Sequence, residues 1–361
     1  MDLNEFSERF RAIERETQRA FLGQEDVLSS VLVAVIARGH VLIEGVPGVG
    51  KTLLVRTLGR VLGCHFRRIQ FTPDLMPSDV TGSTTYNAQT GAFEFKHGPV
   101  FTHVLLADEV NRSPAKTQAA MLEAMQERSV TIDGQTHLLP RPFFVLATQN
   151  PIESAGTYAL PEAQLDRFLF KLVIGHPPLD VEQALLRSVR DGFDAADLDR
   201  LGIQRVASPE LVLAMQDAVT QVRVDDQIIT YIAELVAATR KHRAVAIGAS
   251  PRASISLLQV GRVEAAISDR AFVVPDDVKA HARAVLRHRI ILQPDAEIEG
   301  LTADDVVEQV LRATPVPGMG QVKEGGGLAG GGFGGGGGLS GGGLGGGGLA
   351  GGGLAGGLRG A

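Results

Sequence analysis

The sequence predicts an α/β fold with a parallel sheet, followed by a smaller helical domain. Short apolar runs alternate with helical patterns over the first half of the chain, and a glycine-rich loop joins one such run to a helix. After about Pro178, apolar runs of strand length become rare. We therefore expect an α/β core at residues 1–178, an all-helical domain at 179–315 and a glycine-rich tail at 316–361.

Composition excludes several classes of protein. The chain has 361 residues, one cysteine and a formal net charge of −6. A single cysteine cannot form an intramolecular disulfide, and the acidic balance argues against a broad nucleic-acid-binding surface. The N-terminus is not a secretory signal, and no apolar run approaches the roughly 18 residues that a membrane helix needs. We expect a cytoplasmic protein with no membrane insertion.

Five short apolar runs bounded by polar or turn residues are the expected strands. They lie at 41–43, 66–71, 104–107, 143–147 and 168–174. Two further segments are expected hairpins. One spans 85–101 around Thr90–Gly91, and the other spans 129–139 around Asp133–Gly134. Both interrupt the α/β alternation, so we expect them to project from the sheet.

Helical spacing of apolar residues predicts helices within residues 1–38 and over 54–62. A helix after Pro114 is expected to have Ser113 as its N-cap. Beyond the core, helices are expected at 179–190, 208–222, 225–240, 250–268 and 275–287. Several of these begin at Ser-Pro or Asp, which favour helix N-termini.

The tail dominates the glycine content, since more than half of the 44 glycines follow Pro317. Glycine loses the most backbone entropy on ordering, so we expect a disordered coil. Single leucines, such as Leu339 and Leu344, recur within it. The alternative interpretation is a weakly adhesive segment for self-association or for a partner.

The stretch GVPGVGKT fits the phosphate-loop pattern G-x4-G-K-[ST], and it lies between an apolar strand and an amphipathic helix. Backbone N–H groups of such a loop surround phosphate oxygens, and the helix N-terminus adds partial positive charge. The lysine reaches the β- and γ-phosphates, and the threonine hydroxyl coordinates Mg²⁺. The predicted nucleotide-binding residues are Gly45, Val46, Pro47, Gly48, Val49, Gly50, Lys51, Thr52 and Leu53.

Acidic residues follow a second apolar strand, in the order Val-Leu-Leu-Ala-Asp-Glu. Asp108 would hold Mg²⁺ through water, with Thr52 as the other metal-binding residue, and Glu109 would polarise the attacking water. A third strand leads into Asn150, whose amide could hydrogen-bond the water or the γ-phosphate. An Asn-Pro turn is the alternative interpretation of Asn150.

These motifs carry a family resemblance over about residues 15–315. The chain resembles the AAA+ ATPases, and more closely the MoxR family. The stretches that carry it are GHVLIEGVPGVGKT, RIQFTPDLMPSDVTG, GAFEFKHGPVF, LLADEVNRSPAKTQAAMLEAMQE, FVLATQNP and LPEAQLDRFLF. The resemblance implies a P-loop AAA+ core with a C-terminal lid.

The resemblance also implies roles for individual residues. Asn150 is similar to the sensor-1 residue, Arg167 to the arginine finger and Arg252 to the sensor-2 arginine. The segment from Phe21 to Gln24 resembles the one that packs near adenine. The two hairpins resemble the helix-2 insert and the insert before sensor 1.

We therefore expect Mg²⁺-dependent hydrolysis of ATP by a homo-oligomeric ring, because an arginine finger needs a neighbouring subunit. The resemblance implies that this ring is a hexamer. The resemblance implies remodelling or maturation of client proteins, commonly with a partner that carries a von Willebrand factor A domain. The alternatives are a DNA-directed AAA+ motor or transcription activator, a magnesium-chelatase-like subunit, and a nucleotide-gated scaffold with little turnover.

Other residues are expected to be structural. Cys64 should be a buried apolar filler. His281 and His288 are expected to face solvent, as are the basic pair Arg67–Arg68. No paired metal-ligand spacing of histidines is visible, and a nucleic-acid role is not expected.

Overall fold

The computed structural model describes residues 1–46, 48–150, 158–194 and 197–317. The described residues all belong to one compact unit. The predicted phosphate-loop residue Pro47 and the glycine-rich tail from residue 318 lie outside the described residues. The predictions for both stay predictions.

A five-stranded parallel sheet forms the centre of the α/β core. Its strand order is β2-β5-β8-β1-β9. All five predicted strands are confirmed: β1 (Val41–Gly45), β2 (Phe66–Gln70), β5 (Val104–Asp108), β8 (Phe144–Gln149) and β9 (Phe170–Ile174). Since the strands are parallel, their C-terminal ends share one edge of the sheet. That edge receives the phosphate loop, the acidic pair and Asn150.

Alternate side chains of the strands point to opposite faces of the sheet, and each face has its own core. Val41 and Ile43 pack in one apolar cluster, whereas Leu42 packs in the other. The first cluster holds α1 (Leu3–Gln18), α2 (Glu25–Ile36) and α3 (Lys51–Val61). The second holds α4 (Pro77–Thr81), the short 3-10 helix η1 (Val110–Arg112) and α5 (Ala115–Glu127).

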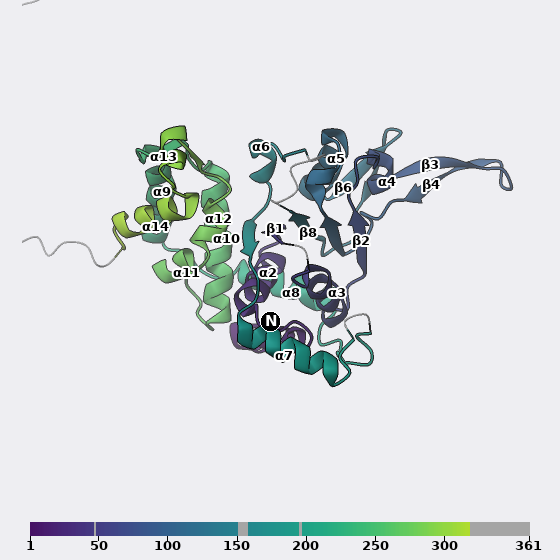
Figure 1. The fold of residues 1–361 in the computed structure, drawn as a ribbon, viewed down its shortest axis with the longest axis horizontal. Helices are drawn as coiled ribbons and strands as arrows, with labels where there is room; N and C mark the ends of the chain where they lie inside the picture. The colour runs from purple at the N-terminus through teal and green to yellow at the C-terminus, as the bar shows by residue number, and fades with distance from the viewer. Residues whose placement is uncertain (47, 151–157, 195–196, 318–361) are drawn as a thin grey trace, which may run out of the picture. The chain divides into compact units, whose positions relative to one another are not determined.

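Both predicted hairpins are present. The first pairs β3 (Gly82–Asn87) with β4 (Ala92–His97), and it extends away from the sheet (Figure 1). The second pairs β6 (Ser129–Ile132) with β7 (Gln135–Leu138). The Asp133–Gly134 turn has φ of 49° and 78°, which is the left-handed backbone that this dipeptide favours in two-residue hairpins.

The segment after β9 is mainly helical. Its helices α9–α14 are grouped together (Figure 1), and a short antiparallel pair, β10 (Val245–Ile247) with β11 (Ile291–Leu292), is added to them. The helices of the described residues after Ser129 are α6 (Glu162–Leu165), α7 (Leu179–Arg190), α8 (Pro209–Val219), α9 (Asp226–Lys241), α10 (Pro251–Ile267), α11 (Pro275–Ala280), α12 (Ala282–Leu286), α13 (Pro294–Ile298) and α14 (Ala303–Ala313).

Part of this segment packs against the core. Gln216 Nε2 in α8 donates to the Val35 carbonyl of α2 at 2.8 Å. The N–H groups of Val206 and Ala207 both donate to the Val61 carbonyl at 3.0 Å. The boundary at residue 178 therefore stays a prediction, as do the other domain limits.

The N-cap prediction for α5 is wrong by one residue. The helix begins at Ala115 with Pro114 in the cap position, and Ser113 Oγ donates to the Val110 carbonyl at 3.3 Å instead. The serine thus stabilises the preceding 3-10 turn. The helices predicted within residues 1–38 are α1 and α2, and the chain turns between Gln18 and Glu25.

The solvent-facing prediction for the two histidines is also wrong. His288 is buried, with Nε2 3.1 Å from the Phe168 carbonyl, and His281 lies 2.7 Å from Glu264 and stacks on Phe170. Both lie where the helical segment meets β9, a contact that helical spacing alone does not reveal. Cys64 is buried as predicted, and burial raises the pKa of its thiol to about 12. Among the described helices, none has the length and apolarity to cross a bilayer.

Candidate nucleotide-binding site

The predicted phosphate loop has the expected strand–loop–helix setting. Strand β1 ends at Gly45 and α3 begins at Lys51, with Thr52 and Leu53 in its first turn. Gly48 and Gly50 have φ of 86° and 82°, a backbone that favours glycine. A Cβ at Gly45 would lie 2.5 Å from the Ile174 carbonyl oxygen. Both the turn and the close approach of β9 therefore require glycine here.

Lys51 folds back over the loop. Its Nζ donates to the Gly45 carbonyl at 2.8 Å. Burial lowers the pKa of Lys51, and the nearby carboxylates of Asp108 and Glu109 act in the opposite direction. A cation held at the loop with acids close by is suited to a bound phosphate chain accompanied by a metal ion.

The acidic pair sits at the end of β5, and Thr148 of the neighbouring strand holds both residues. The Thr148 hydroxyl donates to Asp108 Oδ1 at 2.6 Å and accepts the Glu109 N–H at 2.9 Å. Glu109 has φ of 55°, an uncommon backbone for a residue other than glycine. Thr148 therefore orients the Asp108 carboxylate and fixes the backbone of Glu109.

Arg68 is exposed as predicted, but sequence reasoning missed its contact with the acidic pair. Its Nη2 and Nε donate to Asp108 Oδ2 at 2.7 and 3.2 Å. Strand β2 is the neighbour of β5, and Arg68 lies across from Leu106 in the register. The signal that could have identified Arg68 is its place in β2, the strand that pairs with the acid-bearing β5.

Glu109 is held in a similar way. Gln70 Nε2 donates to Glu109 Oε2 at 2.7 Å, and Arg112 Nη1 donates to the same oxygen at 3.0 Å. A carboxylate that accepts two such bonds is oriented before any substrate arrives.

Asn150 follows β8 at the same edge and is buried. Its carbonyl accepts a hydrogen bond from Asn111 Nδ2 at 3.3 Å. Beside it, Gln149 Nε2 donates to Glu44 Oε2 at 2.7 Å, and Lys171 Nζ lies 2.6 Å from the same oxygen. The C-terminal edge of the sheet thus brings Asn150 to the side of the phosphate loop and of the acidic pair.

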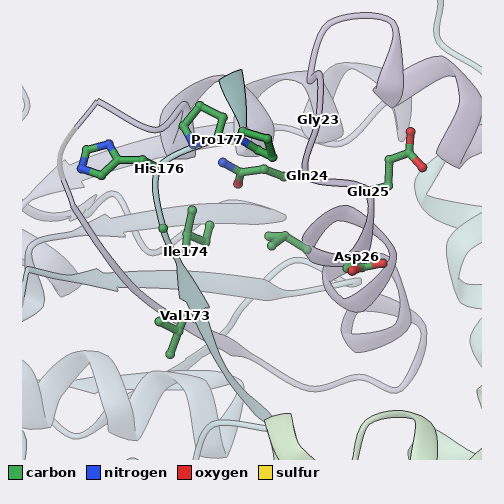
Figure 2. Close-up of a pocket in the computed structure, with 11 residues that line it drawn as sticks. Gly23, Gln24, Glu25, Asp26, Val173, Ile174, His176 and Pro177 are labelled. Carbon is green, nitrogen blue, oxygen red and sulfur yellow. The ribbon is translucent and has the colours of Figure 1, made fainter. Parts of the chain in front are cut away.

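A cavity of about 380 Å³ lies next to Gly45, lined by residues 23–27 and 173–178 (Figure 2). The Gln24 side chain extends from the first segment toward the second (Figure 2), and its buried Oε1 has no hydrogen-bond partner in the described structure. Phe21 is buried against Gly50. The segment that resembles the adenine-side segment thus lines a cavity beside the loop.

Arg167 and Arg252 lie at the opposite edge of the sheet. Arg167 precedes β9, whose Phe170–Ile174 run parallel to Val41–Gly45, so it lies at the N-terminal end of these strands. Arg252 is in the first turn of α10 as predicted, and its Nη1 is 3.9 Å from Asp166 Oδ2. Both arginines line one cavity of about 190 Å³. The structure thus separates them from Lys51, Asp108, Glu109 and Asn150 of the same chain.

The residues present fit a magnesium ion. The Thr52 hydroxyl and the Asp108 carboxylate offer oxygen ligands, and Mg²⁺ in phosphate sites takes one or two such protein ligands with water and phosphate oxygens. In this structure Asp108 Oδ2 accepts a hydrogen bond from Arg68. This hydrogen bond has to loosen for the carboxylate to approach a hydrated ion.

Comparison with known proteins supports an ATPase. Residues 40–170 match the family described as "ATPase family associated with various cellular activities (AAA)", and residues 237–310 match the AAA lid domain. The chain is 48% identical over 299 residues to the uncharacterized protein YeaC of Bacillus subtilis (strain 168), covering 83% of this chain and 92% of that one.

Two further relatives span most of the chain. Chaperone MoxR1 of Mycobacterium tuberculosis is 41% identical over 325 residues, covering 86% of this chain and 83% of its own. A crystal structure of a candidate ATPase from Cytophaga hutchinsonii superposes with a TM-score of 0.80 at 40% identity, covering 87% of this chain and 96% of that one.

Proposed function

This chain belongs to the MoxR family of AAA+ ATPases, and we propose that it hydrolyses ATP at a site completed by a second copy of itself. The observation that carries this proposal is the position of Arg167. It lies at the N-terminal end of β9, whereas the phosphate loop follows the C-terminal end of the adjacent β1. A strand of five residues is roughly 16 Å long. Arg167 therefore serves the nucleotide of another copy.

Within one copy, the phosphate loop and its flanks hold the triphosphate through backbone N–H groups and the Lys51 ammonium. These residues are Gly45, Val46, Pro47, Gly48, Val49, Gly50, Lys51, Thr52 and Leu53. Thr52 and Asp108 hold Mg²⁺, which neutralises phosphate charge when bound. Glu109 takes a proton from the attacking water, and Asn150 orients that water. Gln24 accepts a hydrogen bond from the amino group of adenine in the cavity beside Gly45.

Arg167 and Arg252 supply positive charge to the phosphoryl group from the adjacent copy. Since both line one cavity, we assign Arg252 to the neighbour's nucleotide together with Arg167. In the described part of the chain no carboxylate pairs with Arg167, so its guanidinium is available for this contact. Head-to-tail contacts of this kind close into a ring, and a hexamer is the number we propose.

We further propose that the ring remodels or matures client proteins in the cytoplasm. The name of the relative Chaperone MoxR1 supports such a role. The β3–β4 hairpin, with Tyr86 and Phe93 largely exposed, offers a projecting apolar surface for a client. A partner with a von Willebrand factor A domain is the partner we propose from the family resemblance.

The variant Arg167→Ala tests the shared site. We expect it to bind ATP normally, because the phosphate loop is intact, and to lose about 10³- to 10⁵-fold in turnover. Binding is measured with a fluorescent ATP analogue and turnover by phosphate release. The exposed Arg190, which pairs with Asp191, gives the matched control Arg190→Ala. Turnover by Arg167→Ala close to that of the control would refute the shared site.

A further inference from the structure

The cavity that holds Arg167 and Arg252 contains more positive charge than these two residues supply. Asp166 pairs with Arg289 at 2.7 Å and with Arg252 at 3.9 Å, and Arg38 pairs with Asp217. Within the described residues no carboxylate pairs with Arg128. The charged side chains that line this cavity are Arg38, Arg128, Asp166, Arg167, Arg252 and Arg289. Such a cavity is suited to an anion with several negative oxygens.

Arg128 occupies an uncommon backbone position. It caps the C-terminus of α5 with φ of 52°, a conformation in which glycine is usually found. Its N–H donates to the Ala124 carbonyl and its carbonyl accepts the Leu139 N–H, both at 3.0 Å. Glycine would satisfy the same backbone bonds at lower conformational cost. The backbone therefore does not explain an arginine at this position, and its side chain must.

The Arg128 guanidinium is held weakly within the chain. Its Nη2 reaches the Arg38 carbonyl at 3.5 Å, at the limit of a hydrogen bond. The side chain is half-buried, and burial lowers the pKa of Arg128, with the positive charges of Arg38 and Arg141 acting in the same direction. A cation placed among cations is stabilised by a bound anion.

We propose that Arg128 binds the phosphates of the ATP held by the adjacent copy, beside Arg167 and Arg252. This inference rests on the proposed function. The nucleotide of its own copy is out of reach: His40, which precedes β1, lies 3.1 Å from the Met125 carbonyl near the end of α5, and the phosphate loop follows the far end of β1. Guanidinium groups match phosphate oxygens through paired N–H donors.

The variant Arg128→Gly tests the proposal without disturbing the backbone. We expect turnover to fall by about 10- to 100-fold, as for loss of a charge-assisted contact, with an unchanged or higher midpoint of urea unfolding. Arg128→Lys should restore part of the rate. The control is Arg141→Ala, which removes a nearby exposed arginine that does not line the cavity.

A mixing experiment separates action on the neighbour from a structural role. Arg128→Gly copies keep an intact phosphate loop, and Lys51→Ala copies keep intact arginines, so mixed assemblies should recover turnover that neither variant shows alone. No recovery would overturn the proposal, as would loss of assembly by Arg128→Gly without ATP, which would assign Arg128 to a carboxylate of the neighbour. Normal turnover of Arg128→Gly beside an inactive Arg167→Ala would refute this inference alone. Normal turnover of both would refute the shared site as well.

Discussion

Gln24 shows how a single side chain prepares the cavity for a base. Its Oε1 is buried without a hydrogen-bond partner in the described structure, which is costly unless a ligand donates to it. We expect Gln24→Leu to raise the KM for ATP by roughly fivefold, the value of one hydrogen bond of about 1 kcal/mol. The preference for ATP over GTP should fall as well.

Steady-state kinetics with both nucleotides measure this effect. Asp26 lines the same cavity, so Asp26→Asn is a matched control that changes a neighbouring polar group. An unaltered KM and an unaltered ATP preference in Gln24→Leu would show that adenine does not bind in this cavity.

Arg68 shares Asp108 with the metal ion that we propose there. Its side chain is 47% exposed, so its ion pair is worth about 1 kcal/mol or less. We expect Arg68→Gln to free the carboxylate and to lower the Mg²⁺ concentration for half-maximal nucleotide binding by up to about fivefold. A Mg²⁺ titration with a fluorescent ATP analogue measures this, with Arg67→Gln as control. A higher Mg²⁺ requirement would show that Arg68 helps the site instead.

The sequence predicted the positions of the candidate site residues better than their contacts. The phosphate loop and the acidic pair were predictable because each follows an apolar strand at a fixed spacing. Arg68 and Thr148 were missed, since their roles depend on which strands are neighbours, and strand order is set by tertiary packing. Asn150 was a candidate because it follows a third strand, whereas the roles of Arg167 and Arg252 came from the family resemblance. An arginine after Leu-Asp, such as Arg167, has no distinctive local signal.

At the scale of elements, local patterns determined most of the fold. The five strands are short, apolar and bounded by turns, and the Asp133–Gly134 turn has a strong hairpin preference, so all were predictable. The contacts of His281 and His288 were not. They lie between a helical segment and a strand more than a hundred residues away, and such distant contacts leave no periodic pattern in the sequence.

The two hairpins are joined by a cluster of rings. Phe95 of β4 stacks on His137 of β7 with centroids 4.3 Å apart, and His97 stacks on Phe101 at the same distance. Contacts of this kind contribute about 0.5–1.5 kcal/mol. We therefore expect Phe95→Ala to speed amide hydrogen exchange several-fold in both hairpins, with the five-stranded sheet unchanged.

Phe93 provides the control for this prediction. It is 75% exposed and packs edge-on against Tyr86 of the same hairpin, so Phe93→Ala should leave exchange in β6–β7 as it is. Equal exchange in β6–β7 for wild type and Phe95→Ala would show that the hairpins are independent.

At the scale of the whole molecule, stability should depend on pH through His40. Its Nδ1 accepts the Val145 N–H and its Nε2 lies 3.1 Å from the Met125 carbonyl, so the ring ties β8 to α5 as a neutral imidazole. Burial lowers the pKa of His40 to about 4. The unfolded chain, with a histidine pKa near 6.5, binds the proton first.

The free energy of unfolding should therefore be constant above about pH 7 and should decrease as the pH falls from about 6.5 toward 4. The loss from His40 approaches roughly 3 kcal/mol at the lower limit. Burial lowers the pKa of His288 in the same direction. Urea unfolding at several pH values, with an NMR titration of the His40 ring, measures this. A ring that becomes charged at pH 6 in the folded protein would contradict it.

The central claim is that the ATP site is built from two copies of this chain, and the dependence of turnover on protein concentration tests it most directly. With saturating ATP and Mg²⁺, we predict that turnover per chain rises with concentration in step with assembly, as followed by sedimentation velocity on the same samples. A dilute sample that stays monomeric and still hydrolyses ATP at the full rate would contradict the account.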